Sequence, residues 1–281
     1  MVRKSQRELL EMSFWRFIVN TTTGICPFCP NQGSKMTREH LVSAWIDELF
    51  KSSGYNVRRY DETGLVKKWR KAKLDEKAFA ACGECNNGWM SDIEAEMKAA
   101  FSDVIRAGVK VSLLPRGLAL LAAFAFKCAV VADHMNPADG TLFYTTHTRH
   151  IFRESLQIPD GVQMWLFAFR GRYAHSGIFH GYYLKPRPES SPFHNLNFHI
   201  FTFLTGRLGF QVASPKWLDV RRSGQKLPLL CPEDIWGTAA VRFWPLDGLP
   251  VSFPPRHYLS DDSLEAFANR LGTVTMRINN F

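Results

Sequence analysis

The chain has 281 residues, of which 46% are hydrophobic, so it can bury a sizeable core in one large domain or two moderate ones. Lys and Arg number 35 against 26 Asp and Glu, and the formal net charge of +9 lowers the cost of approaching phosphate. Six cysteines are too few for a disulfide-dense secreted scaffold of this length, which excludes that class.

The first stretch, residues 1–19, interleaves charged and apolar side chains. It lacks the apolar core of a signal peptide, and its pattern predicts a short amphipathic helix. Without an export signal we expect a cytoplasmic protein, and in that reducing compartment paired cysteines usually bind metal.

The next two segments are predicted to be a turn-rich loop and a helix. Residues 21–35 are rich in Thr, Gly, Pro and Asn, and they contain the first cysteine pair. Leu41–Phe50 carries apolar residues at helical spacing, which predicts a helix with His40 near its start.

Residues 55–81 contain two stretches of strand-forming residues around the sequence Asp61-Glu62-Thr63-Gly64. This pattern predicts a β-hairpin that leads into the second cysteine pair. Beyond that pair, apolar residues recur every four positions and predict an amphipathic helix with one apolar stripe. The stripe consists of Trp89, Ile93, Met97 and Phe101.

Residues 106–281 are predicted to form a larger α+β accessory domain of unknown role. Gly117–Ala132 is almost wholly apolar and is interrupted by Lys127. A spanning helix needs about 20 apolar residues, and a lysine within it is costly in lipid, so we expect a buried core helix and no membrane partner. The other predicted elements are strands over Val162–Phe169 and Asn197–Leu204 and a last helix over Ser263–Leu271.

Two Cys-x-x-Cys pairs are the strongest chemical signal in the sequence, Cys26 with Cys29 and Cys82 with Cys85. Two intervening residues let both sulfurs of a pair face one ion, and two such pairs complete a closed tetrahedral site of the structural zinc type. The alternatives are two unrelated pairs and a redox Cys-x-x-Cys. The pattern favours a structural zinc ion.

The dipeptide Glu39-His40 has two interpretations. A carboxylate can hold a hard divalent cation, and a neighbouring histidine can deprotonate water. Alternatively, Glu39 is an acid at a helix start and His40 is merely exposed. The dipeptide alone favours this second interpretation.

Asn86 and Asn87 follow the last cysteine directly. An amide oxygen at this fixed position can share one Mg²⁺ with Glu39, because a zinc ion ties the two segments together. The alternative is an ordinary helix N-cap. Trp89 is a possible platform for a base, although its place in the apolar stripe favours packing in the core.

These residues together resemble a known family. Cys-Pro-Phe-Cys, Arg-Glu-His and Cys-Gly-Glu-Cys-Asn-Asn-Gly-Trp-Met are similar to elements of the zinc-supported HNH endonucleases, and most similar to a bacterial subgroup with Arg-Glu-His and Cys-x-x-Cys-Asn-x-Gly-Trp-Met. The resemblance covers residues 20–105 and implies a zinc-stabilised, treble-clef-like ββα-metal module there. It implies that Glu39 binds a catalytic Mg²⁺ or Mn²⁺, that His40 is the general base, and that Asn86, with Asn87 a close second, completes the metal site.

Basic residues gather in the predicted hairpin beside this site. On the hairpin they can contact phosphates, and Arg38 is a further candidate phosphate contact. The alternative is a solvated strand face. The candidates in the hairpin are Arg58, Arg59, Lys67, Lys68, Arg70 and Lys71.

We therefore predict an α+β protein that acts as a metal-dependent HNH-type endonuclease on DNA phosphodiester bonds, with structural zinc. The alternative is a catalytically inactive, zinc-stabilised DNA-binding or interaction module, and a nuclease that acts on RNA is a third possibility. Residues 106–281 are expected to choose the substrate, bind a partner or form a homodimer.

Overall fold

The computed structural model describes residues 26–30, 35–50, 54–61, 64–73, 77–134, 142–171, 176–183, 198–216, 237–269 and 274–280. The helix predicted for residues 1–19 lies outside them. The described residues form a mixed α+β structure, in agreement with the predicted α+β class, and the treble-clef-like ββα-metal module stays a prediction.

The segment that follows the first cysteine pair is a strand and not a helix start. Strand β1 (Met36–His40) pairs antiparallel with β4 (Lys77–Cys82), so that Met36 lies opposite Cys82 and His40 opposite Lys77. Helix α2 (Ala44–Phe50) begins only after the strand has ended. The prediction that His40 lies at the start of a helix is therefore wrong, because pairing with the largely buried β4 extends the backbone of residues 36–40.

Three helical pieces follow β4 without a break. They are α3 (Gly83–Cys85), the wide turn η1 (Asn86–Met90) and α4 (Ser91–Ala107). The predicted apolar stripe is confirmed, because Ile93, Met97 and Phe101 are all buried on α4. The hairpin predicted around residues 61–64 is also confirmed, as β2 (Tyr55–Asp61) and β3 (Gly64–Lys71).

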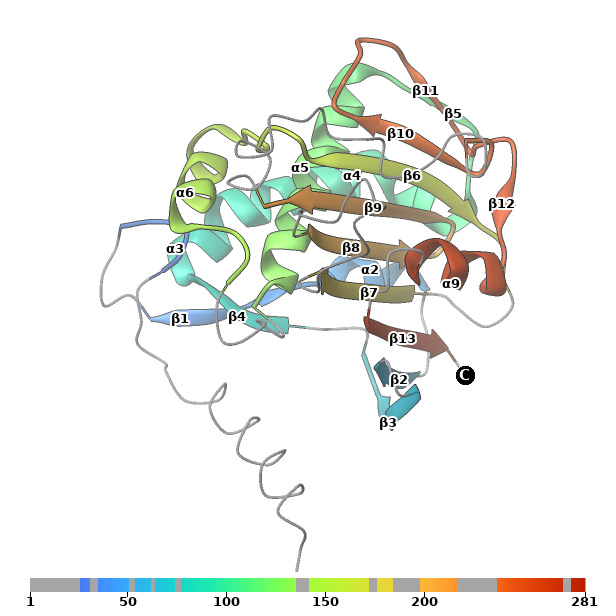
Figure 1. Cartoon of the computed structure of the whole chain (residues 1–281), viewed down its shortest axis with the longest axis horizontal. Coiled ribbons are helices and arrows are strands. Elements are labelled where there is room, and N and C mark those ends of the chain that lie inside the picture. Colours follow the sequence, from blue (N-terminus) through green and yellow to red (C-terminus); the bar gives the residue numbers. More distant parts are fainter. Residues whose placement is uncertain are drawn as a thin grey trace, which may run out of the picture.

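Within the described residues, nine strands form one large sheet in the order β10-β6-β9-β8-β7-β13-β2-β3, with β12 beside β6 (Figure 1). Strands β2 and β3 come from the predicted nuclease segment, and the others come from residues 106–281. The sheet therefore crosses the boundary that we expect after residue 105. The strands from residues 106–281 are β6 (Gln163–Phe169), β7 (Ser176–Tyr183), β8 (Phe198–Thr205), β9 (Leu208–Pro215), β10 (Ala240–Trp244), β12 (Tyr258–Leu259) and β13 (Val274–Asn280).

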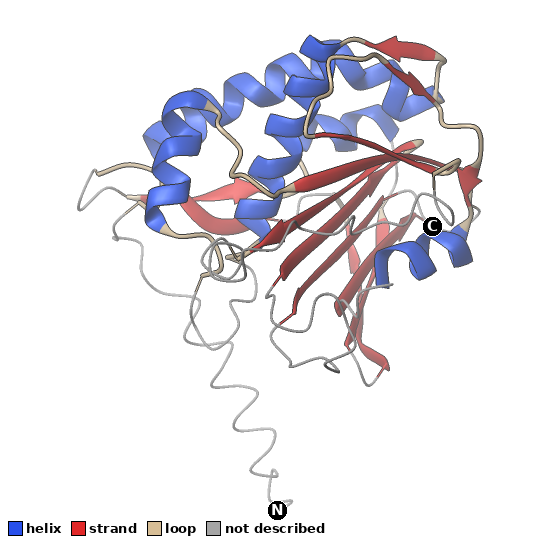
Figure 2. Cartoon of the chain, turned by 45° about the horizontal axis from the view of Figure 1, so that its top comes forward, coloured by secondary structure: helices blue, strands red, loops and turns tan. Residues whose placement is uncertain are grey.

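Helices cover both faces of this sheet (Figures 1 and 2). Helices α4 and α5 (Pro115–Ala132) lie on one side, whereas α9 (Asp261–Asn269) lies on the other. Alternate residues of β6 pack on opposite faces of the sheet. Leu166 belongs to the core with α5, and Phe167 belongs to the core with α9. Every residue of β6 is consequently buried.

Helix α5 is the core helix that the sequence predicts. In the described part of the chain it is the one helix that is long and apolar enough to cross a membrane, and most of it is buried inside the protein. Its lysine, Lys127, is fully buried. The remaining described elements are α6 (Thr146–Ser155) and the small antiparallel pair β5 (Val111–Leu113) and β11 (Val251–Phe253).

Candidate functional site

The four paired cysteines form one buried cluster. Their sulfur atoms lie within 4.8 Å of one another. The sulfurs of Cys26 and Cys85 are 3.9 Å apart, and those of Cys29 and Cys82 are 3.6 Å apart. A disulfide needs about 2.0 Å, whereas thiolates bonded to zinc at about 2.3 Å lie about 3.8 Å apart at the corners of a tetrahedron. The cluster has the dimensions of a site for a structural metal such as zinc.

The protonation of the cluster also favours a cation. The hydrogen bond with the Cys85 thiol, opposed by burial, lowers the pKa of Cys26 to about 4. The same hydrogen bond and burial raise the pKa of Cys85. The backbone N–H of Cys82 donates to the Cys26 sulfur at 3.4 Å, which stabilises a thiolate there. A divalent ion would replace the shared protons and leave all four sulfurs ionised.

Short local elements position each cysteine pair. Cys26 and Cys29 occupy a turn, and Phe28 between them is buried. The Phe28 ring packs edge-on against Trp89, with 5.6 Å between the ring centroids. Trp89 also contacts Phe152, at 5.5 Å. Trp89 therefore packs against the core, as the apolar stripe predicts.

Asn86 fastens the turn after the cluster to strand β1. Its amide nitrogen donates hydrogen bonds to Thr37 Oγ1 at 2.9 Å and to the carbonyl oxygen of Arg38 at 3.2 Å. Thr37 Oγ1 donates in turn to the carbonyl oxygen of Ala81 on β4. Helix α4 has Met90 at its N-cap position, so Asn86 holds two elements together and does not cap α4.

Glu39 lies in a buried ion-pair network that the sequence does not predict. Lys127 Nζ contacts Glu39 Oε1 and Glu94 Oε1, each at 2.5 Å. The side chains of Lys127 and Glu39 are 0% and 2% exposed, whereas that of Glu94 is 18% exposed. The network joins β1, α4 and α5, and Glu94 is its most exposed member.

The charges of the network are set by burial and by the partners together. Burial raises the pKa of Glu39, and the charge of Lys127 opposes this rise. Burial by itself lowers the pKa of Lys127, but the charges of Glu39 and Glu94 outweigh it and raise that pKa. Lys127 is therefore an ammonium ion, and it is held beside carboxylates away from water.

His40 and Arg38 are more accessible than Glu39. Strand neighbours alternate between faces, and accordingly Glu39 is buried, His40 is half-buried and Arg38 is exposed. The Arg38 guanidinium lies 4.9 Å from the centroid of the Phe79 ring on β4. Asn87 is exposed beside the half-buried Asn86.

The residues implied for a catalytic Mg²⁺ or Mn²⁺ do not fit that ion in this arrangement. A hard divalent cation needs oxygen ligands. The Glu39 carboxylate contacts Lys127, and Asn86 directs its amide nitrogen to β1. An ammonium ion thus holds the carboxylate that the divalent ion would use, and the assignment of Glu39, Asn86 and Asn87 to such an ion stays a prediction.

Candidate phosphate contacts lie on β2 and β3 at one end of the sheet. Lys68 and Arg70 are exposed and Lys71 is half-buried, and the backbones of Arg58, Arg59 and Lys67 belong to the same two strands. Arg58 lies in register between Lys68 of β3 and Arg277 of β13.

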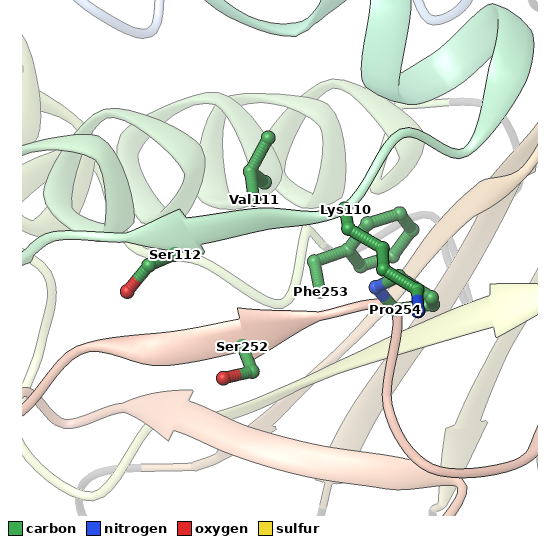
Figure 3. Close-up of a pocket in the computed structure, with 6 residues that line it drawn as sticks. All are labelled: Lys110, Val111, Ser112, Ser252, Phe253 and Pro254. Carbon is green, nitrogen blue, oxygen red and sulfur yellow. The ribbon is translucent and has the colours of Figure 1, made fainter.

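A shallow cavity of about 360 Å³ lies between β5 and β11 (Figure 3). Lys110, Ser112 and Ser252 are its polar residues, and Val111, Phe253 and Pro254 complete the lining. None of the residues that the sequence predicts for the site lines this cavity.

No protein-family model, curated protein or solved structure matches this chain.

Proposed function

We propose that this protein is a zinc-stabilised endonuclease of the HNH type that hydrolyses phosphodiester bonds in DNA. One observation carries the proposal. The cysteine cluster joins the paired strands β1 and β4, which bear His40, to the turn that bears Asn86. The cluster brings an imidazole and an amide from distant parts of the sequence into one region.

In the proposed mechanism, His40 accepts a proton from water and the resulting hydroxide attacks phosphorus. The bond from phosphorus to the 3′ oxygen breaks, and that oxygen takes up a proton from solvent. The resemblance also implies a divalent ion, which would supply positive charge, and Glu39 is the residue implied to hold it, although Glu39 contacts Lys127 in this arrangement. Arg38 and the basic strands β2 and β3 hold the phosphates.

A second candidate function is a non-catalytic, zinc-stabilised DNA-binding module. The contact of Lys127 with Glu39 favours it, because this contact takes the carboxylate that would hold the catalytic ion. The basic strands β2 and β3 would serve this function unchanged.

Plasmid nicking separates the two functions. We expect the wild-type protein with Mn²⁺ to nick supercoiled plasmid and His40→Ala to lower the rate by about 10²–10⁴-fold, the usual contribution of a general base. His147→Ala is the matched control, because His147 is exposed on α6. Nicking by the wild type and by His147→Ala, but not by His40→Ala, supports the enzyme. Equal weak nicking by all three proteins indicates a contaminating nuclease. Retention of DNA without nicking supports the second function, and structured RNA in the same assay tests the third possibility.

Loss of positive charge from β3 is expected to weaken DNA binding in a salt-dependent way. Each phosphate contact contributes about 0.9 to the slope of log K against log salt. The double variant Lys68→Ala, Arg70→Ala should therefore lower that slope by about 2 in fluorescence anisotropy titrations of a DNA duplex. Lys98→Ala is the control, because Lys98 is an exposed lysine that pairs with Glu48 on α2. An unchanged slope in the double variant would show that this strand does not contact DNA.

A further inference from the structure

The loop that precedes β11 presents large apolar side chains to solvent. Residues 245–250 are all exposed, and they include Leu246 and the 65% exposed Leu249. The register of β5 with β11 brings the end of this loop beside Leu114, which is 62% exposed. Apolar side chains that gather in this way on a surface mark a contact with another molecule.

The local sequence restrains the loop. Pro245 and Pro250 stand at its two ends, and Asp247 Oδ1 accepts the backbone N–H of Leu249 at 2.9 Å. Gly248 between them has a φ of 82°, a conformation that glycine adopts without strain. A loop that is already ordered loses little conformational entropy when it binds, so its leucines are well suited to docking.

The same two-stranded ribbon of β5 and β11 also carries a hollow. The shallow cavity of about 360 Å³ is lined by residues of both strands, and β11 directly follows the loop (Figure 3). Val111, Phe253 and Pro254 give the cavity an apolar wall. Lys110 is the charged residue among those that line it, and it is exposed. A leucine-bearing loop and an apolar hollow therefore lie next to each other on one ribbon.

We propose that two copies of this chain form a dimer through this ribbon, with the loop of each copy seated in the cavity of the other. A two-fold axis makes every contact twice, so one surface that carries both a projection and a hollow can complement itself. The two loop leucines cover the apolar wall of the partner's cavity, and Asp247 pairs with the partner's Lys110.

Charge complementarity favours a second copy as the occupant of the cavity. The loop carries one carboxylate, from Asp247, between its two leucines. The cavity carries one ammonium ion, from Lys110, beside its apolar wall. The order of charged and apolar groups on the loop thus matches that of the cavity. An anionic lipid surface fits less well, because it would repel the Asp247 carboxylate.

Sedimentation velocity of the full-length, zinc-loaded protein over a range of concentrations tests the dimer. Leu249→Ala removes two leucine side chains from each dimer, so the dissociation constant should rise by about 100-fold or more. Leu156→Ala is the matched control, because Leu156 is also exposed but follows α6, which lies far from the ribbon (Figure 1). It should dimerise like the wild type.

Charge reversal tests the proposed pairing itself. Asp247→Lys and Lys110→Asp each place like charges together twice in the dimer, so each should weaken it by about tenfold or more. The double variant restores opposite charges and should recover most of the lost affinity. Near-ultraviolet circular dichroism of each variant checks that these exposed substitutions leave the fold intact.

Three results would overturn the proposal. They are a wild-type protein that stays monomeric up to its solubility limit, a dimer that Leu249→Ala does not weaken, and a double variant that dimerises no better than either single one. Leucine-dependent sedimentation of a monomeric wild type with vesicles of phosphatidylcholine and phosphatidylserine would instead assign the loop to a membrane surface.

Discussion

Replacement of Cys82 by Ser is expected to abolish tight zinc binding and to unfold the region around β1, β4 and α3. The reason is that Cys82 ends β4 and its sulfur lies 3.6 Å from that of Cys29, so the loss opens the cluster that holds these elements together. A structural zinc site contributes about 10–16 kcal/mol of apparent binding free energy at neutral pH, which is as large as the whole stability of an ordinary domain, about 5–15 kcal/mol. Zinc content by mass spectrometry and protection of amides in β1 and β4 from hydrogen exchange would measure both effects.

Cys128 provides the matched control for this prediction. It is buried on α5, and its sulfur lies 3.8 Å from the carbonyl oxygen of Leu41, away from the four paired cysteines. Cys128→Ser should therefore keep one zinc ion per chain and retain the protected amides. A Cys82→Ser protein that also keeps its zinc and its protection would contradict the structural role of the cluster.

Replacement of Arg149 by Met is expected to destabilise the whole protein by about 3–5 kcal/mol, the usual loss when one partner of a buried ion pair is removed. Arg149 Nη2 contacts Asp133 Oδ2 at 2.5 Å, and both side chains are fully buried. Arg149 Nε also donates to the carbonyl oxygen of Tyr144 at 3.0 Å. The Asp133 carboxylate accepts the backbone N–H groups of Phe143 and Tyr144 as well, so its charge would remain buried without its cation.

Urea unfolding of zinc-loaded protein would measure this loss. The control is Arg106→Met, which breaks the exposed pair of Arg106 with Asp103 on α4. Exposed pairs contribute about 0–1 kcal/mol, so the control should stay close to the wild type. Equal free energies of unfolding for the two variants would show that the buried pair is not what holds α6 to the end of α5.

The elements that depend on local sequence were predictable. Two residues between cysteines place two sulfurs on one side of a turn whatever the rest of the chain does, and both pairs join the cluster. The stripe on α4 follows from helical periodicity, and the continuous apolar run of α5 predicts a helix that is buried on all sides. The hairpin of β2 and β3 was predictable from its acidic, glycine-ended turn.

The errors and omissions come from contacts between distant residues. Glu39 and His40 precede a helical pattern, yet Glu39 pairs with Ala78 and His40 with Lys77 in a strand. Periodicity within a window cannot detect a partner that lies so far along the chain. The propensity of the local sequence for a helix therefore yields to strand pairing.

Lys127 was visible in the sequence, but its role was not. A single lysine in an apolar helix argues against a membrane-spanning helix, and the sequence alone supports this interpretation. Because a buried charge needs a partner, the same lysine also predicts a buried carboxylate somewhere in the fold. Which carboxylate it contacts depends on how α5 packs against β1 and α4, and only the structure shows that Glu39 and Glu94 lie there.

The position of β13 affects the order in which the strands of the large sheet pair during translation. Strand β13 lies between β7 and β2 and pairs with both, so the hairpin of β2 and β3 reaches the sheet through residues 274–280. A ribosome makes the hairpin early and this bridging strand much later. Because pairing must wait for the later strand, β2 lacks this strand partner through most of translation, although its Tyr55 belongs to the core with α5. A nascent or truncated chain can therefore assemble its cysteine cluster while it still lacks the finished row of Lys68, Arg58 and Arg277.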